Sequence, residues 1–307
     1  MDTSMKWLKD YVPDLNVSDQ EFMDAMTLSG SKVECYNRLD ADVDKIVVGQ
    51  IKKIDKHPDA EKLVICQVDV GADELLQIVT GAPNAVVGMK TPVVLDGGRV
   101  AGGHDGKMTP GGIKIKKGKL RGVESYGMLC SGDELGINED FYEGAGVYGL
   151  LDLKGNPPLG EDIKKVLGLD DYIFDISLTA NRPDCQCVYG IAREVAAITK
   201  TALKSPDISF KEYETKAKPV SVDVEAPDLC PRYIGRYVEG DAQGMKKQSP
   251  AWLRKRLALC GLRSVSPVVD ITNFVLLELG QPMHSFDADK IAGRKIIVRR
   301  AKDGEKI

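Results

Sequence analysis

The chain has 307 residues, and at roughly 100–200 residues per domain this length predicts two or three domains. Hydrophobic residues make up 43% of the chain, charged residues 29% and aromatic residues 6%, a balance that excludes disordered, collagen-like and coiled-coil proteins. The longest apolar runs, such as 274–277, have four residues, too few to cross a membrane, and the first 13 residues lack the apolar segment of a signal peptide. A cytoplasmic protein is therefore expected.

The net charge of −4 is unevenly distributed along the chain. Residues 103–122 carry six basic side chains against the single acid Asp105, a local charge of +5, so the rest of the chain carries −9. A concentrated basic segment in an acidic protein indicates an anion-binding surface. A solvated charged loop is the alternative that the charge alone leaves open.

Cysteine and histidine patterns indicate neither a disulfide framework nor a metal site. The seven cysteines are scattered, odd in number and contain no C-x-x-C pair. The three histidines (57, 104 and 284) have no helically spaced His or Glu partner. Glycine-rich nucleotide-binding fingerprints are also missing from the sequence.

In chain order, the first predicted element is a helix that begins at the capping box of Ser18 and Glu21 and ends at Gly30. Residues 42–153 contain short β-rich runs separated by Gly, Pro and Asn, which predict a small barrel or sandwich. These runs are 46–54, 63–70, 75–80 and 91–95. Seven glycines between positions 97 and 112 predict a flexible arm that leads into the basic stretch.

The second half begins with a predicted strand over 172–178 and a helix that carries Ile191, Val195 and Ile198 on one face. A polar linker is expected over 205–219, followed by helices from Ser249 to Gly261 and over 270–280. Residues 296–307 predict a hairpin. Because the chain would then stop inside a returning strand, a fragment of a longer protein is expected.

Four blocks in the middle of the chain carry a specific resemblance. They are HPDAEKL at 57–63, VDVG at 68–71, IVTGAPN at 78–84 and KLRGVESYGMLCS at 119–131. In this order and spacing they resemble the tRNA-binding OB-fold of several aminoacyl-tRNA synthetases and of free tRNA-binding proteins. The resemblance implies that cations of the basic stretch contact tRNA phosphates. These cations are Lys114, Lys116, Lys117, Lys119 and Arg121. Turn-forming roles are favoured for His57 and Asn84.

The flanking segments narrow the resemblance. They include WLKDYV at 7–12, DISLTANRPDC at 175–185, GIARE at 190–194, CPRY at 230–233 and VDITNFVLLELGQPMHSFD at 269–287. Together with the middle blocks they are similar to the amino-terminal part of the β subunit of bacterial phenylalanyl-tRNA synthetases, over essentially the whole chain.

The resemblance implies an α+β multidomain architecture. An OB-fold β-barrel over 40–152 is inserted into a small α+β domain formed by 1–39 and 153–200, and 205–307 form the first part of an α+β editing domain. Family members are α2β2 heterotetramers in which the α subunit attaches Phe to tRNA(Phe) with ATP and Mg²⁺. The β subunit binds tRNA and hydrolyses mischarged Tyr-tRNA(Phe). The fragment alone is expected to be inactive and to bind neither ATP nor a metal.

Editing has a physical rationale, because an apolar pocket cannot strongly exclude a Tyr that differs from Phe by one hydroxyl. A second, polar site can hydrogen-bond that hydroxyl. The resemblance implies that Thr272, Asn273 and His284 lie in this editing pocket, where Gln281 is also of the right chemical type. Arg263 is expected to orient the substrate or face its phosphate. The family completes the pocket with residues beyond position 307.

Two alternative functions remain open at this stage. A free-standing OB-fold tRNA-binding protein would lack the flanking segments that match the synthetase pattern. A free-standing editing hydrolase would require a complete editing fold, which an end inside a hairpin would not provide.

Overall fold

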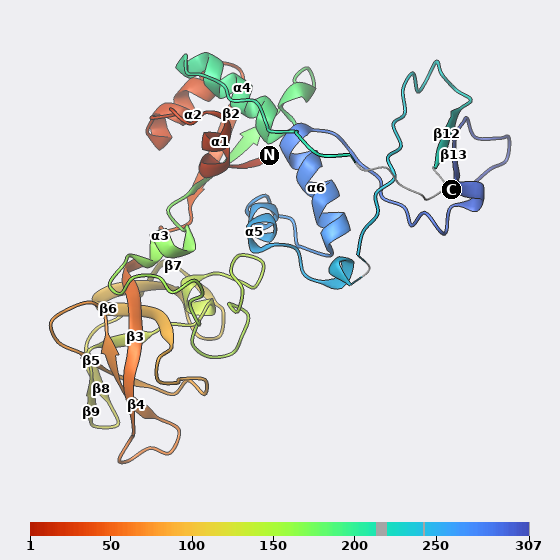
Figure 1. Cartoon of the computed structure of the whole chain (residues 1–307). Coiled ribbons are helices and arrows are strands. Elements are labelled where there is room, and N and C mark those ends of the chain that lie inside the picture. The colour runs from red at the N-terminus through yellow and green to blue at the C-terminus, as the bar shows by residue number, and fades with distance from the viewer. Residues whose placement is uncertain (213–219, 242, 307) are drawn as a thin grey trace.

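The computed structural model describes residues 1–212, 220–241 and 243–306. A three-stranded antiparallel sheet, in the order β1–β11–β2, joins the two segments that flank the middle of the chain. Its strands are β1 (Asp2–Ser4), β2 (Lys32–Arg38) and β11 (Tyr172–Ser177). The helices packed with this sheet are α1 (Met5–Tyr11), α2 (Asp19–Leu28) and α4 (Val188–Thr199) (Figure 1).

Local sequence explains where the first two helices begin. The Ser4 hydroxyl accepts a hydrogen bond from the Trp7 backbone N–H, and Ser18 and Glu21 form the expected capping box of α2. The helices bury Trp7 and Phe22 against Phe174 of β11. Burial of a large apolar side chain contributes about 1.5–3 kcal/mol, so this cluster, the α+β core, holds together segments that are far apart in sequence.

The middle of the chain, the β module, is built around a six-stranded antiparallel sheet. The sheet follows the order β10–β6–β3–β4–β5, and β7 also pairs with β6. Its strands are β3 (Asp44–Lys56), β4 (Val64–Asp69), β5 (Leu76–Thr80), β6 (Lys90–Gly102), β7 (Met108–Lys114) and β10 (Gly127–Leu129). A separate hairpin is formed by β8 (Gly118–Leu120) and β9 (Val123–Ser125), and the short helix α3 (Ile163–Leu167) packs on β3. All four predicted β-rich runs are strands.

The expectation of a flexible glycine arm was wrong, because most of residues 97–112 belong to β6 and β7. The glycines permit close backbone approach instead of disorder: a Cβ at Gly112 would lie 2.4 Å from the Asp42 carbonyl oxygen. At Gly102 it would lie 2.8 Å from that of Lys107. Glycine is depleted in ordinary strands, so a run of glycines in the sequence predicts an arm even where the backbone forms strands.

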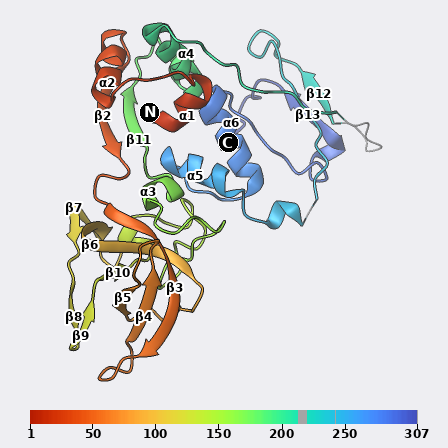
Figure 2. The same cartoon turned by 60° about the vertical axis from the view of Figure 1, so that its left-hand side comes forward.

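Helices α5 (Ala251–Leu259) and α6 (Pro267–Leu279) lie against the α+β core (Figures 1 and 2). Phe274 of α6 stacks on Trp7 with ring centroids 5.3 Å apart and meets the edge of Trp252 at 5.4 Å. The second helix begins three residues earlier than predicted, because Ser266 caps it and Pro267 occupies its first turn.

The predicted C-terminal hairpin was also wrong. β13 (Lys295–Val298) pairs in parallel with β12 (Ser221–Val224), and residues 299–306 form no strand. The hairpin on which the expectation of a fragment depends is therefore not formed by residues 296–306. In the predicted linker, residues 205–212 form no helix or strand, whereas 213–219 lie outside the described residues.

Short 3₁₀ helices lie in the connections, at Asp133–Leu135, Pro183–Cys185, Gly244–Lys246 and Ala292–Arg294. All seven cysteines are free. Within the described ranges, no helix is both long enough and apolar enough to cross a lipid bilayer.

Candidate functional site

The basic stretch forms the β8–β9 hairpin and the segment that leads into it. Leu120 pairs with Val123, so Arg121 and Gly122 form a two-residue turn at the tip. Both have positive φ, 48° for Arg121 and 88° for Gly122, as a type I′ hairpin turn requires. In both views this hairpin lies at the end of the β module away from α1 (Figures 1 and 2). The turn therefore presents the Arg121 side chain at an exposed tip.

The five predicted cations of this stretch are all exposed to solvent, from Lys114 at the end of β7 to Arg121. Glu124 stands opposite Lys119 in the hairpin, with the ammonium nitrogen 3.8 Å from a carboxylate oxygen. A hydrogen bond from the Tyr126 hydroxyl, followed by the charge of Lys119, lowers the pKa of Glu124. The hairpin thus carries an excess of positive charge that this single carboxylate does not cancel.

A sixth cation joins this surface, and sequence reasoning missed it. Arg99 on β6 stands directly opposite Lys114 on β7. Directly opposed residues in an antiparallel pair point to the same face of the sheet, so these two positive charges lie side by side. Because Arg99 and Lys114 are far apart in the sequence, no run of basic residues indicates that they are neighbours. Only the β6–β7 register, which depends on the glycine-rich strands, could have identified Arg99.

The side chains of His57 and Asn84, both expected to form turns, make hydrogen bonds to the backbone. The bond between His57 and Asp59 is local, and the others reach residues more than 60 positions away. The Nδ1 atom of His57 accepts from the Asp59 backbone N–H at 3.1 Å, and its Nε2 lies 3.1 Å from the carbonyl oxygen of Leu120. The Asn84 side-chain amide makes two hydrogen bonds to the Leu150 backbone. Its Nδ2 donates to the Leu150 carbonyl oxygen at 2.9 Å, and its Oδ1 accepts from the Leu150 N–H at 2.8 Å. His57 therefore links the β3–β4 loop to the end of β8, and Asn84 links two loops of the β module.

The five residues predicted for an editing pocket lie on and beside α6. Thr272 and Asn273 are on the helix, Arg263 precedes it, and Gln281 and His284 follow it in an exposed loop. The Thr272 hydroxyl donates to the Val269 carbonyl of its own helix at 2.8 Å. The His284 ring is exposed and lies 6.3 Å from the Phe286 ring, centroid to centroid. Within the described part of the chain, no hydrogen bond or ion pair joins any two of the five.

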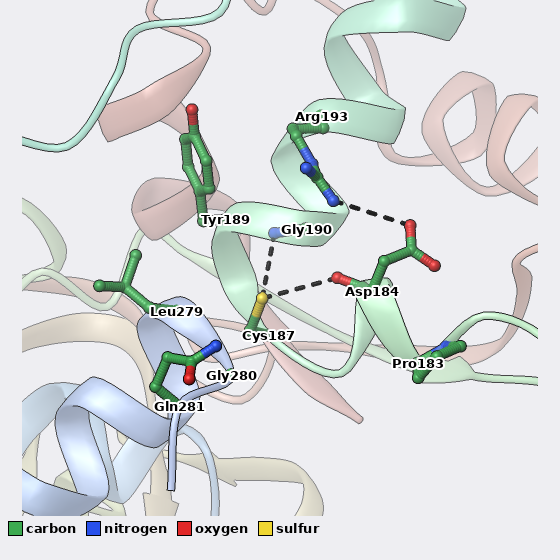
Figure 3. A pocket seen from close by; sticks show the side chains of 9 residues that line it. All are labelled: Pro183, Asp184, Cys187, Tyr189, Gly190, Arg193, Leu279, Gly280 and Gln281. Atoms are coloured by element: carbon green, nitrogen blue, oxygen red, sulfur yellow. Dashed lines mark hydrogen bonds and ion pairs between the residues drawn. The ribbon is translucent and has the colours of Figure 1, made fainter. Parts of the chain in front are cut away.

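Gln281 does line a cavity of about 260 Å³ between α4 and the end of α6 (Figure 3). On the α4 side, the Sγ atom of Cys187 accepts from the Gly190 N–H at 3.3 Å, and Arg193 approaches Asp184 at 3.8 Å. The lining residues are Pro183, Asp184, Cys187, Tyr189, Gly190, Arg193, Leu279, Gly280 and Gln281. The other four predicted pocket residues do not line this cavity, so the structure does not bring the five together here.

Buried Asp270 fixes the start of α6. Its carboxylate accepts hydrogen bonds from the Ser249 and Ser264 hydroxyls and, at 2.9 Å, from the Val265 backbone N–H. Burial alone would raise the pKa of Asp270, but these hydrogen bonds outweigh burial and the pKa is lowered. The Asp270 carboxylate therefore holds the segment before α5 and the loop before α6 next to each other through these hydrogen bonds.

One group of three side chains among the described residues has the spacing of metal ligands: Asp184, Cys185 and Glu194. The Arg182 guanidinium lies 3.0 Å from the Asp184 carboxylate and 2.6 Å from that of Glu194. These contacts raise the pKa of Arg182. Magnesium prefers oxygen ligands, whereas this group offers a thiol and two carboxylates that already neutralise a cation. The group therefore does not fit Mg²⁺.

Comparison with known proteins gives two family matches. The tRNA binding domain family matches residues 46–161, and the B3/4 domain family matches residues 229–307.

Curated relatives match the whole chain. A phenylalanine–tRNA ligase β subunit of Clostridium acetobutylicum is 48% identical over 100% of this chain and 37% of its own length. The corresponding protein of Ralstonia nicotianae is 45% identical over 98% of this chain and 35% of its own length. The chain thus spans about a third of the length of these relatives.

Likeness to solved structures is weak. A MetRS-related protein from Pyrococcus horikoshii is 23% identical, with a TM-score of 0.25 over 48% of this chain and 96% of that chain. Such a score supports no conclusion about fold or function.

Proposed function

We propose that this chain, which is similar to phenylalanine–tRNA ligase β subunits over essentially its whole length, contributes tRNA binding and proofreading to such a ligase. Its partners would be tRNA(Phe) and an α subunit that attaches Phe to the tRNA with ATP and Mg²⁺, in an α2β2 heterotetramer. The ligase would act in the cytoplasm. Hydrolysis of Tyr-tRNA(Phe) would fall to the region around α6. Relatives that match the full length of the chain favour this function over a free-standing tRNA-binding protein.

We infer that the β module closes into an OB-fold barrel. Its sheet runs from β10 to β5, and hydrogen bonds connect β5 to the two residues that directly precede β10. The Tyr126 N–H donates to the Gln77 carbonyl oxygen at 2.9 Å, and the Val79 N–H donates to the Ser125 hydroxyl at 3.1 Å. In this proposal the barrel spans 40–152, the α+β domain 1–39 and 153–200, and an incomplete editing domain 205–307.

The exposed basic stretch, which consists of the β8–β9 hairpin and the segment that leads into it, is the single observation that carries the proposal of tRNA binding. Its cations lie within the residues that match the tRNA binding domain family. Neutralised phosphates release counterions, so each contact contributes about 0.7–0.9 to the slope of log Kobs against log salt concentration. A surface that binds tRNA through Lys114, Lys116, Lys117 and Lys119 must therefore show a salt dependence that these side chains set.

The test replaces these four lysines by Ala in the heterotetramer and measures tRNA(Phe) binding across salt concentrations. We expect weaker binding and a slope reduced by about 3. A matched control replaces Lys9, Lys32, Lys165 and Lys211, which are exposed and lie outside the β module. An unchanged slope in the variant that lacks the four lysines of the basic stretch, or an equal reduction in the control, would refute phosphate contact by this stretch.

A further inference from the structure

The β8–β9 hairpin is attached to the β module through β9, where the Ser125 hydroxyl accepts from the Val79 N–H at 3.1 Å, and through one side-chain contact on each of its strands. Its strands pair with each other and are not part of the six-stranded sheet. An isolated two-stranded hairpin is only marginally stable in water, so its orientation depends on contacts with its surroundings. Gln77 supplies one contact, because its side-chain amide donates to the Glu124 carbonyl oxygen at 2.9 Å. His57 supplies another, at the opposite strand.

The two hydrogen-bond partners of the His57 ring fix its orientation. Its side chain is buried, with the residue only 6% exposed. Because Nδ1 accepts the Asp59 N–H, Nε2 must carry the proton and donate to the Leu120 carbonyl. The imidazole therefore bridges the β3–β4 loop and the end of β8.

We propose that His57 is a positioning residue that orients the basic hairpin toward RNA phosphates. The inference rests on the proposed tRNA binding. Leu120, whose carbonyl His57 holds, lies between Lys119 and Arg121, and directly precedes the positive-φ turn at the tip. A fixed carbonyl at this position restricts the direction of both neighbouring cations. The buried ring is not itself available to a phosphate.

The experiment measures tRNA(Phe) binding to the heterotetramer carrying His57→Ala. If the ring orients both cations, the salt slope falls by up to about 2, close to the effect of replacing Lys119 and Arg121 by Ala. We expect an affinity loss of about tenfold at physiological salt. Added to Lys119→Ala and Arg121→Ala, His57→Ala should weaken binding less than twofold further, because the cations that it orients are gone.

Two further variants keep the test decisive. Asn84→Ala removes a similar pair of side-chain to backbone hydrogen bonds from the same module without touching the hairpin, and should leave the slope unchanged. Gln77→Ala removes one of the bonds that hold β9 and should reduce the slope in the same direction as His57→Ala, which covers the case that His57→Ala does not fold.

The outcomes separate the two proposals. A normal slope in the Lys119 and Arg121 variant would refute phosphate contact by these two residues and overturn the positioning role of His57, whereas the wider binding surface is judged by the four-lysine variant. A reduced slope in the Lys119 and Arg121 variant but a normal slope in His57→Ala and Gln77→Ala would overturn the positioning role alone. The positioning role would also be overturned if His57→Ala weakened tRNA binding as much in the variant that lacks Lys119 and Arg121 as it does in the natural protein. The ring would then act independently of these two cations.

Discussion

Lys255 shows how one side chain can respond to pH through burial. Its ammonium group donates to the Leu167 carbonyl oxygen at 2.5 Å and lies 4.3 Å from the centre of the Phe141 ring. Burial, helped by the nearby charge of Lys6, lowers the pKa of Lys255 to about 8. The unfolded chain keeps the ordinary lysine value of about 10.4, so between these two values the unfolded state binds more protons. The free energy of unfolding must therefore rise with pH in this window.

Replacing Lys255 by Met removes this titration. We expect the free energy of unfolding of the natural protein to gain about 1–2 kcal/mol relative to Lys255→Met between pH 7.5 and 10. Urea unfolding of both proteins at several pH values measures the difference. Lys247→Met, at an exposed lysine, is the control and should follow the natural protein. Parallel pH profiles for the natural protein and Lys255→Met would contradict the burial argument.

At the scale of the element, α5 is a junction between three parts of the molecule. Successive helical residues point about 100° apart, so three basic side chains in a row reach three different neighbours. Arg254 donates to the Glu139 carbonyl oxygen at 2.7 Å, and Lys255 meets the end of α3. Arg256 pairs with Asp10 and lies 5.1 Å from the centre of the Trp7 ring. The helix thus connects the β module to the α+β core.

Loss of the third contact should loosen α5 and α6 from the α+β core. In Arg256→Ala, amide hydrogen exchange should accelerate roughly tenfold or more within 251–279, since an ion pair and a cation–π contact are removed together. Protection of β3 and β4 should not change. Hydrogen-exchange mass spectrometry of the β chain measures both regions, with Lys247→Ala as control. Uniform acceleration throughout the chain would indicate global destabilisation and contradict a local junction.

Elements with local signals were predictable from the sequence. The cap of α2 at Ser18 and the run of cations at 114–121 each depend only on residues that are close together in the sequence. The pairing of β13 with β12 does not, because the two strands are about 70 residues apart and no local pattern specifies a distant parallel partner. Arg99 was missed for the same reason: its position opposite Lys114 depends on register. The five pocket residues stay predictions, since α6 spreads them over a helix and two loops.

In the whole protein, the proposed proofreading depends on where His284 would lie in the assembled ligase. Its ring is exposed on the loop after α6 and, among the described residues, has no hydrogen-bond partner, so it is free to engage a ligand. A histidine that transfers a proton in the hydrolytic step, as a general acid or base, contributes about 10²–10⁴-fold. This magnitude separates a hydrolytic role from a structural one.

We therefore expect His284→Ala to lower Tyr-tRNA(Phe) deacylation by the intact heterotetramer about 100-fold, while attachment of Phe by the α subunit is retained. Ser285→Ala, a change in the same exposed loop, is the matched control and should deacylate normally. Equal deacylation by the natural protein and His284→Ala would reduce His284 to a loop residue. Loss of both activities would assign it a role in the fold or in assembly, because the two reactions would use separate sites and only such damage would affect both.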